Sequence, residues 1–175
     1  SQAARHLERP NADTRCASLD ALSLLVQIGD HRYINVAVAR VQDDDANVRR
    51  VAAEALGKIV EKSDPYAMGL ILPLVEDVRD FIRSSALYAL TEVAKQGDWR
   101  ALGAVLGRCE DPDSKIRYRA VEAIAKVAAK GDKKCISAVV ARLEDHERNV
   151  QGVAIGSLGK MTDEKSFPRE AVSRL

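Results

Sequence analysis

Hydrophobic and polar positions along this chain repeat with a period of 34 residues. The segment 111–132 (DPDSKIRYRAVEAIAKVAAKGD) has related copies at 77–98, 43–64 and 145–166. In each copy, apolar or small residues lie one position before a basic column and three, six, seven and ten positions after it. This spacing puts them on one face of an α-helix. Each copy therefore predicts one helix, which we call the second helix of a repeating unit.

The same columns extend to the N-terminal part of the chain, where Ala21 and Leu25 are expected in the core. The second helices are expected near residues 11–28, 45–62, 79–96, 113–130 and 147–162.

A first helix is predicted before each later second helix, and an aspartate is expected to cap it. Glycines precede most of these caps and suit the end of the preceding helix. The turns between paired helices are short, which favours antiparallel packing. The expected caps are Asp30, Asp64, Asp98 and Asp132, and the glycines are Gly29, Gly97 and Gly131.

Units of this length cannot bury an apolar face alone and have to stack on their neighbours. We therefore expect an all-α fold, an α-α superhelix, in which residues 1–175 form a single solenoid of about five repeats. Ala3, Ala4 and Leu7 align with a first helix, and 166–175 resembles another one. Neither end has the polar character of a capping repeat, so a piece of a longer array or end-to-end association is expected.

A turn aspartate and the arginine six residues after it recur from unit to unit. A catalytic residue is needed once, whereas a packing device is needed in every unit, so we expect these residues to form structural Arg–carboxylate pairs. The expected ladder comprises Arg15, Asp43, Arg49, Asp77, Arg83, Asp111, Arg117 and Asp145.

The spacing D-x5-R, with Val or Ile just before the arginine and A-x-x-A-L/I after it, resembles the HEAT repeat. The short period makes the chain more similar to the compact repeats named after phycobilisome lyases. The resemblance implies that second helices line a concave surface, where outward positions follow the arginine column by one, five and nine residues. The partner-binding candidates at these positions are Arg50, Glu54, Lys58, Tyr88, Glu92, Tyr118, Glu122 and Lys126. The alternative is a solvated face of Glu-to-Lys pairs.

Composition and charge narrow the choice of partner. Basic and acidic residues number 27 and 26, for a net charge of +1, which provides no overall field for nucleic acid. No apolar run approaches a membrane span, and Cys16, Cys109 and Cys135 form no C-x-x-C pair, so we expect an intracellular, cytoplasmic protein. Cys109 occupies a core column, whereas Cys16 and Cys135 are expected to be accessible.

Several single residues have two interpretations. Trp99 is expected to pack over the loop edge, with a partner contact as the alternative. Gly152, Gly156 and Gly159 predict that the last helix frays first, or let a partner backbone approach. The histidines, His6, His31 and His146, are far apart in the repeat frame, so neither a metal nor another cofactor is expected.

These patterns favour a non-catalytic scaffold that binds a protein through its second helices. An enzyme subunit of the phycobilin lyase type is the alternative that the resemblance implies, although no catalytic residues are visible. Deoxyhypusine hydroxylase-like chains hold di-iron with several His-Glu pairs, and here the single pair is His146-Glu147. Nucleic-acid binding is the third hypothesis, which Glu54, Glu92 and Glu122 disfavour by interrupting the basic surface.

Overall fold

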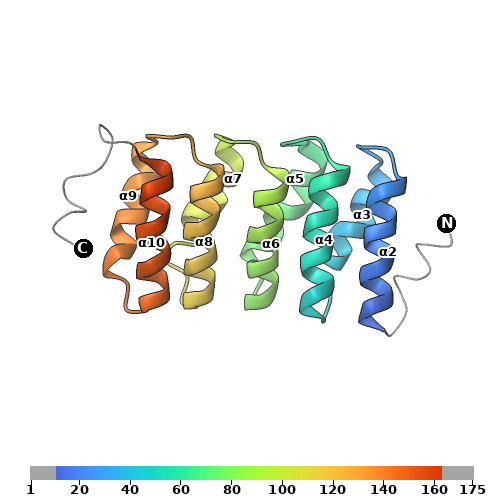
Figure 1. The fold of residues 1–175 in the computed structure, drawn as a ribbon, viewed down its shortest axis with the longest axis horizontal. Coiled ribbons are helices and arrows are strands. Elements are labelled where there is room, and N and C mark those ends of the chain that lie inside the picture. Colours follow the sequence, from blue (N-terminus) through green and yellow to red (C-terminus); the bar gives the residue numbers. More distant parts are fainter. Residues whose placement is uncertain (1–10, 163–175) are drawn as a thin grey trace. The chain divides into compact units, whose positions relative to one another are not determined.

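A computed structural model describes residues 11–162, and all regular structure in that range is helical (Figure 1). The chain divides into two compact units, Ser1–Ala94 and Lys95–Leu175. The segments expected to form first helices at either end of the chain lie outside the described residues. The expectation that 1–175 is a single solenoid stays a prediction.

Both units alternate a shorter first helix with a 14-residue second helix, and consecutive second helices within a unit pack side by side (Figure 1). In the first unit the elements are α2 (Ala12–Leu25), α3 (His31–Arg40), α4 (Ala46–Ile59), α5 (Pro65–Ile71), the 3-10 helix η1 (Leu72–Glu76) and α6 (Asp80–Val93). In the second unit they are α7 (Trp99–Gly107), α8 (Ser114–Val127), α9 (Lys133–Ala141), the 3-10 helix η2 (Arg142–Glu144) and α10 (Arg148–Met161).

Aspartates cap the first helices as the sequence predicts. The Asp98 carboxylate accepts hydrogen bonds from the N–H groups of Arg100 and Ala101, at 2.9 and 3.3 Å. Such bonds satisfy backbone donors that have no partner within the helix. The remaining caps are Asp30, Asp64 and Asp132.

The core consists mainly of the predicted apolar columns, and in the second helices α4, α6, α8 and α10 all of these positions are buried. The prediction is wrong for Ala21 and Leu25, which are exposed on α2. Within the described residues, α2 has a second-helix neighbour, α4, on one side only. In a further column, four residues after the arginine position, Leu19, Ala53, Leu87 and Val121 are also buried, because second helices pack directly against each other, whereas Ile155 on α10 is 50% exposed.

Pro73 shortens the first helix of its unit. A proline has no N–H to donate and its ring conflicts with the carbonyl four residues earlier, here that of Gly69. The α-helix α5 accordingly ends at Ile71, and the chain continues as the 3-10 helix η1. Val75 in η1 is still fully buried, so the core column survives the change of helix type.

The glycines before the caps have a role that the sequence did not indicate. Gly29, Gly97 and Gly131 each lie four residues beyond the end of a second helix, with φ of 85°, 80° and 77°, so they are not helix caps. Ser63 takes the same place with φ 62°. Each of these residues donates its N–H to the last carbonyl of the next second helix. The bonds join Gly29 to Ile59 (2.8 Å), Ser63 to Val93 (2.8 Å), Gly97 to Val127 (2.6 Å) and Gly131 to Met161 (2.9 Å).

Candidate functional site

The repeated arginines join neighbouring repeats within each unit. Arg15 on α2 donates to both carboxylate oxygens of Asp43, at 3.0 and 2.7 Å. Arg117 on α8 holds Asp145 in the same way, with both bonds at 2.8 Å. Paired N–H···O bonds of this kind fix direction as well as distance. The two pairs therefore set the position of one turn against the next.

Two other arginines of the ladder bind the turns through backbone oxygens. The Arg49 guanidinium donates to the carbonyls of Asp43 and Asp44, at 2.7 and 2.9 Å, and to the Ser85 hydroxyl at 3.1 Å. Arg83 similarly donates to the carbonyl of Asp77 at 3.0 Å. The contacts of Arg49 thus correct the expectation that every ladder arginine meets an aspartate carboxylate: this side chain closes its own turn by capping backbone acceptors.

A second arginine column reinforces the turn aspartates. It lies three residues before each aspartate, a signal present in the sequence but not used in the prediction. Leu74 replaces the arginine in the unit of Asp77, and Arg79 binds that carboxylate instead, at 2.8 Å. The column pairs are Arg40–Asp43 (3.4 Å), Arg108–Asp111 (3.4 Å) and Arg142–Asp145 (3.7 Å).

These arginines favour the ionised carboxylates. The hydrogen bonds from Arg117 lower the pKa of Asp145 despite its burial. Burial is the strongest influence on Asp43 and opposes ionisation, but Arg15, the Asp45 N–H and Arg40 together lower the pKa of this group. Arg79 lowers the pKa of Asp77 to about 2. The arginines therefore keep the carboxylates of Asp43, Asp77 and Asp145 ionised, as a structural role requires.

The side chains at the outward positions of α4 and α6 contact one another. Arg50 and Glu54 form an ion pair at 2.6 Å, and the Tyr88 hydroxyl lies 3.3 Å from the same Glu54 oxygen. Tyr88 is half-buried, and this burial, followed by the nearby Glu92 and Glu54, raises its pKa. Glu92 lies against Gly57, where an added Cβ would be 3.0 Å from the Glu92 Cβ. The Arg50–Glu54 pair differs from the Glu-to-Lys pairing expected of a solvated face.

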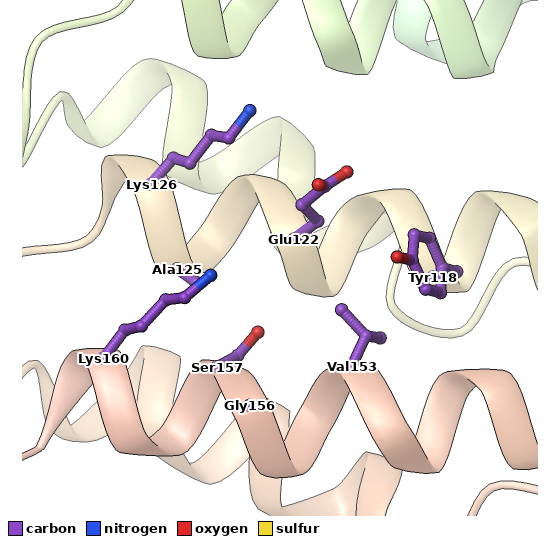
Figure 2. A pocket seen from close by; sticks show the side chains of 8 residues that line it. All are labelled: Tyr118, Glu122, Ala125, Lys126, Val153, Gly156, Ser157 and Lys160. Carbon is purple, nitrogen blue, oxygen red and sulfur yellow. The ribbon is translucent and has the colours of Figure 1, made fainter.

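The equivalent face of α8 and α10 is hollow. A cavity of about 140 Å³ lies between the two helices. Figure 2 shows Tyr118 and Val153 at one end, Lys126 and Lys160 at the other, and Gly156 without a side chain between them. Glu122, Ala125 and Ser157 complete the lining.

Three of the candidates expected from the sequence, Tyr118, Glu122 and Lys126, thus lie together in this hollow, which has both charged and aromatic walls. Tyr118 is half-buried, and the Arg119 guanidinium lies 6.0 Å from its ring centroid. Arg119 also donates to Glu122 Oε2 at 2.8 Å. Lys58, the remaining sequence candidate, is exposed on α4.

The structure corrects two expectations about accessible side chains. Trp99 is 78% exposed and does not pack over a loop edge, because it stands at the first position of α7, in the same outward register as His31 and Lys133. Cys135 is buried, because it aligns with the core alanine Ala101.

Within the described part of the chain, the cysteines and histidines show no grouping for chemistry. Burial raises the pKa of Cys135 to about 12 and that of Cys109 to about 11. Cys16 is half-buried. His31 stacks on Tyr66 with ring centroids 3.9 Å apart, and His6 lies outside the described residues. Among residues 11–162, no three His, Cys, Asp or Glu side chains are grouped as metal ligands would be, and no helix there is long and apolar enough to cross a membrane.

Paired helices that repeat every 34 residues, joined by Arg–Asp bonds and by turn-to-helix hydrogen bonds, define an α-solenoid repeat protein. The family model of HEAT repeats matches residues 2–91 and 100–169. The chain therefore belongs to the HEAT-repeat family.

Solved structures agree with this fold. The complex of CpcE and CpcF of phycocyanin lyase from Nostoc sp. PCC7120 is similar with a TM-score of 0.65 and 16% identity, over 89% of this chain and 95% of that chain. A designed armadillo repeat protein in complex with the peptide (KR)4 is similar with a TM-score of 0.57 and 16% identity, over 99% and 86%. At these identities the likeness is one of fold. The comparison with curated proteins gives no match.

Proposed function

We propose that this chain is a non-catalytic scaffold that binds a segment of a partner protein along the outward positions of its second helices. The observation that carries this proposal is the hollow between α8 and α10. It gathers Tyr118, Glu122 and Lys126 from one helix and faces them with Lys160 from the next. An aromatic ring beside charged groups of both signs suits a protein segment, because such segments combine apolar area with polar side chains.

The charges on this face support a protein partner over nucleic acid. Arg50 is paired with Glu54 on α4, and Arg119 with Glu122 on α8. Phosphate recognition needs several cations that remain available to neutralise the backbone. Alternating signs instead give a surface that can distinguish one peptide sequence from another.

The chemical state of the side chains supports a binding role over catalysis. The raised pKa values of Cys109 and Cys135 keep these thiols protonated and poorly nucleophilic near neutral pH. The recurring Arg–Asp pairs are used to join repeats, as the bidentate bonds of Arg117 to Asp145 illustrate. We therefore propose no reaction for the chain.

The similar designed armadillo repeat protein, whose structure is a complex with the peptide (KR)4, gives further support. It is a helical-repeat protein that binds a peptide. The peptide bound by that protein carries only basic side chains. In this chain the side chains that flank the hollow, Lys126 and Lys160, are themselves basic and would attract acidic residues. We expect this chain to select peptides that carry acidic residues.

Selection from a random peptide display library with the intact chain tests the proposal. The recovered sequences are then synthesised and their affinities measured by titration calorimetry. Tyr118→Ala and Lys126→Glu should each weaken the selected peptide by about fivefold or more. Lys134→Glu is the matched control, because Lys134 is an exposed lysine on α9. Equal effects of Lys126→Glu and Lys134→Glu, or recovery of no peptide, would contradict the proposal.

A further inference from the structure

The repeat register provides an internal reference for the hollow. Residues two periods of 34 apart occupy equivalent places, so α8 and α10 can be compared with α4 and α6. Glu122 on α8 then corresponds to Glu54 on α4, since 122 − 54 = 68. By the same arithmetic Gly156 on α10 corresponds to Tyr88 on α6, since 156 − 88 = 68. The two pairs also differ nearby, where Tyr118 stands in the place of Arg50 and Lys160 in the place of Glu92, but at this position the difference is a whole tyrosine side chain.

In the α4–α6 pair, that side chain reaches from one helix to the other. The Tyr88 ring is half-buried, and its hydroxyl lies 3.3 Å from Glu54 Oε1. In the α8–α10 pair the glutamate is kept, while Gly156 has nothing within 4 Å of the place where its Cβ would lie. The cavity of about 140 Å³ lies at this position and is lined by both Glu122 and Gly156 (Figure 2).

Glu122 retains capacity to accept another hydrogen bond. Its Oε2 accepts from Arg119 at 2.8 Å, and a carboxylate has about four acceptor positions over its two oxygens. In the α4–α6 pair, Glu54 likewise accepts from an arginine, Arg50, and from the Tyr88 hydroxyl at once. The missing partner of the α8–α10 pair is therefore a hydroxyl donor on a flat ring.

We propose that the hollow binds a tyrosine side chain of the partner protein, an inference that rests on the function proposed above. The ring lies over Gly156 and its hydroxyl donates to the Glu122 carboxylate. Lys126 and Lys160 stand at one end of the hollow and Tyr118 at the other (Figure 2). The two ammonium groups favour an acidic residue next to the bound tyrosine, because opposite charges there improve complementarity.

The test uses the intact chain labelled with 15N and two small probes, p-cresol and toluene, which mimic the side chains of tyrosine and phenylalanine. We expect p-cresol to shift the amide signals of Glu122 and Gly156. Toluene should bind about tenfold more weakly, because it leaves the carboxylate without a hydroxyl donor. Equal affinity of the two probes, or shifts confined to other helices, would overturn the inference.

Two variants sharpen this test. Gly156→Tyr should fill the hollow from within and abolish the p-cresol shifts. Gly152 is an exposed residue of the same helix that does not line the cavity, so Gly152→Tyr should preserve the shifts. Glu122→Gln keeps the shape and should reduce the preference for p-cresol over toluene to about threefold or less. Unchanged p-cresol binding in Gly156→Tyr, with helical content intact, would contradict the inference.

The outcome also separates this inference from the function on which it rests. If a display-selected peptide is weakened by Lys126→Glu but not by Gly156→Tyr, the face binds protein without a tyrosine in the hollow. That result overturns the tyrosine assignment alone. If neither variant affects any selected peptide, both proposals fail.

Discussion

Asp145 has more partners than its position in an exposed turn would suggest. It accepts two hydrogen bonds from Arg117 and one from the Glu147 N–H, and it also pairs with Arg142. Its side chain is 3% exposed. A buried carboxylate with these partners contributes to stability only while it is ionised.

Replacing Asp145 with Asn should therefore destabilise the protein in a pH-dependent way. At pH 7 we expect a loss of roughly 3 kcal/mol, because Arg117 and Arg142 remain as partly buried cations without their carboxylate. The pKa of Asp145 is lowered in the folded protein, so its contribution is present above the ordinary value of 3.8. It is lost as the pH falls below that value through the folded pKa, and wild type and variant should converge there.

Urea unfolding between pH 7 and pH 3 measures this difference. Asp44→Asn is the control. Asp44 is exposed and follows Asp43, the residue equivalent to Asp145 in an earlier repeat, so its replacement should change stability by less than about 0.5 kcal/mol. A loss in Asp145→Asn that is equally large at pH 7 and pH 3 would show that the ion pair is not its cause.

The positive-φ glycines give a second test at the scale of single residues. Gly131 has φ 77° and open space around its missing Cβ, so Gly131→Ala meets no clash and costs only backbone strain, roughly 1 kcal/mol. Gly103 lies inside α7, also in open space, and Gly103→Ala should stabilise by roughly 0.5–1 kcal/mol. Thermal unfolding of the two variants should thus shift in opposite directions. A shift in the same direction would refute the role given to Gly131.

Among the helices, α8 and α10 have equal length but different composition. Both contain 14 residues, yet α10 carries Gly152, Gly156 and Gly159 and has Ile155 50% exposed. Each glycine in a helix interior weakens it by roughly 0.5–1 kcal/mol relative to alanine. The helix α10 should therefore open more often than α8 on its own.

Hydrogen exchange checks this expectation directly. Amides in 150–161 should exchange faster than those in 116–127, and Gly152→Ala with Gly159→Ala should slow them, because both glycines face open space. Gly156 is left unchanged so that the hollow stays open. Equal protection of the two helices in the wild type would remove the idea of a weaker last repeat.

Sequence periodicity predicted the helices and their caps wherever local rules alone determine where a helix begins and which face it buries. It predicted the Asp caps and the second helices because capping and amphipathic spacing are local properties. It did not foresee that α5 gives way to η1 at Pro73, or that the glycine turns bond to the next helix. The change at Pro73 is a local effect found in one repeat, whereas the glycine bonds depend on contacts between repeats, and the common period specifies neither.

For the molecule as a whole, the family and fold class could be predicted because every repeat uses the same core columns. The candidate site was predicted less completely. Tyr118, Glu122 and Lys126 were identified by their register, but the hollow they share depends on Gly156 of the next helix. Tyr88 had the same signal in the sequence, yet in the structure it reaches across to Glu54 on α4. The surroundings of each tyrosine depend on the residues of the neighbouring helix that face it. Comparing repeats reveals this only once it is known which helices pack together.

Binding of a partner protein to the outward face of the second helices can be tested directly. The most direct measurement is an amide chemical-shift titration of the intact 15N-labelled chain with a display-selected peptide. The account predicts that the largest shifts fall within 118–126 on α8 and 153–160 on α10, around the hollow. Shifts that concentrate instead on the first helices α7 and α9 would contradict it.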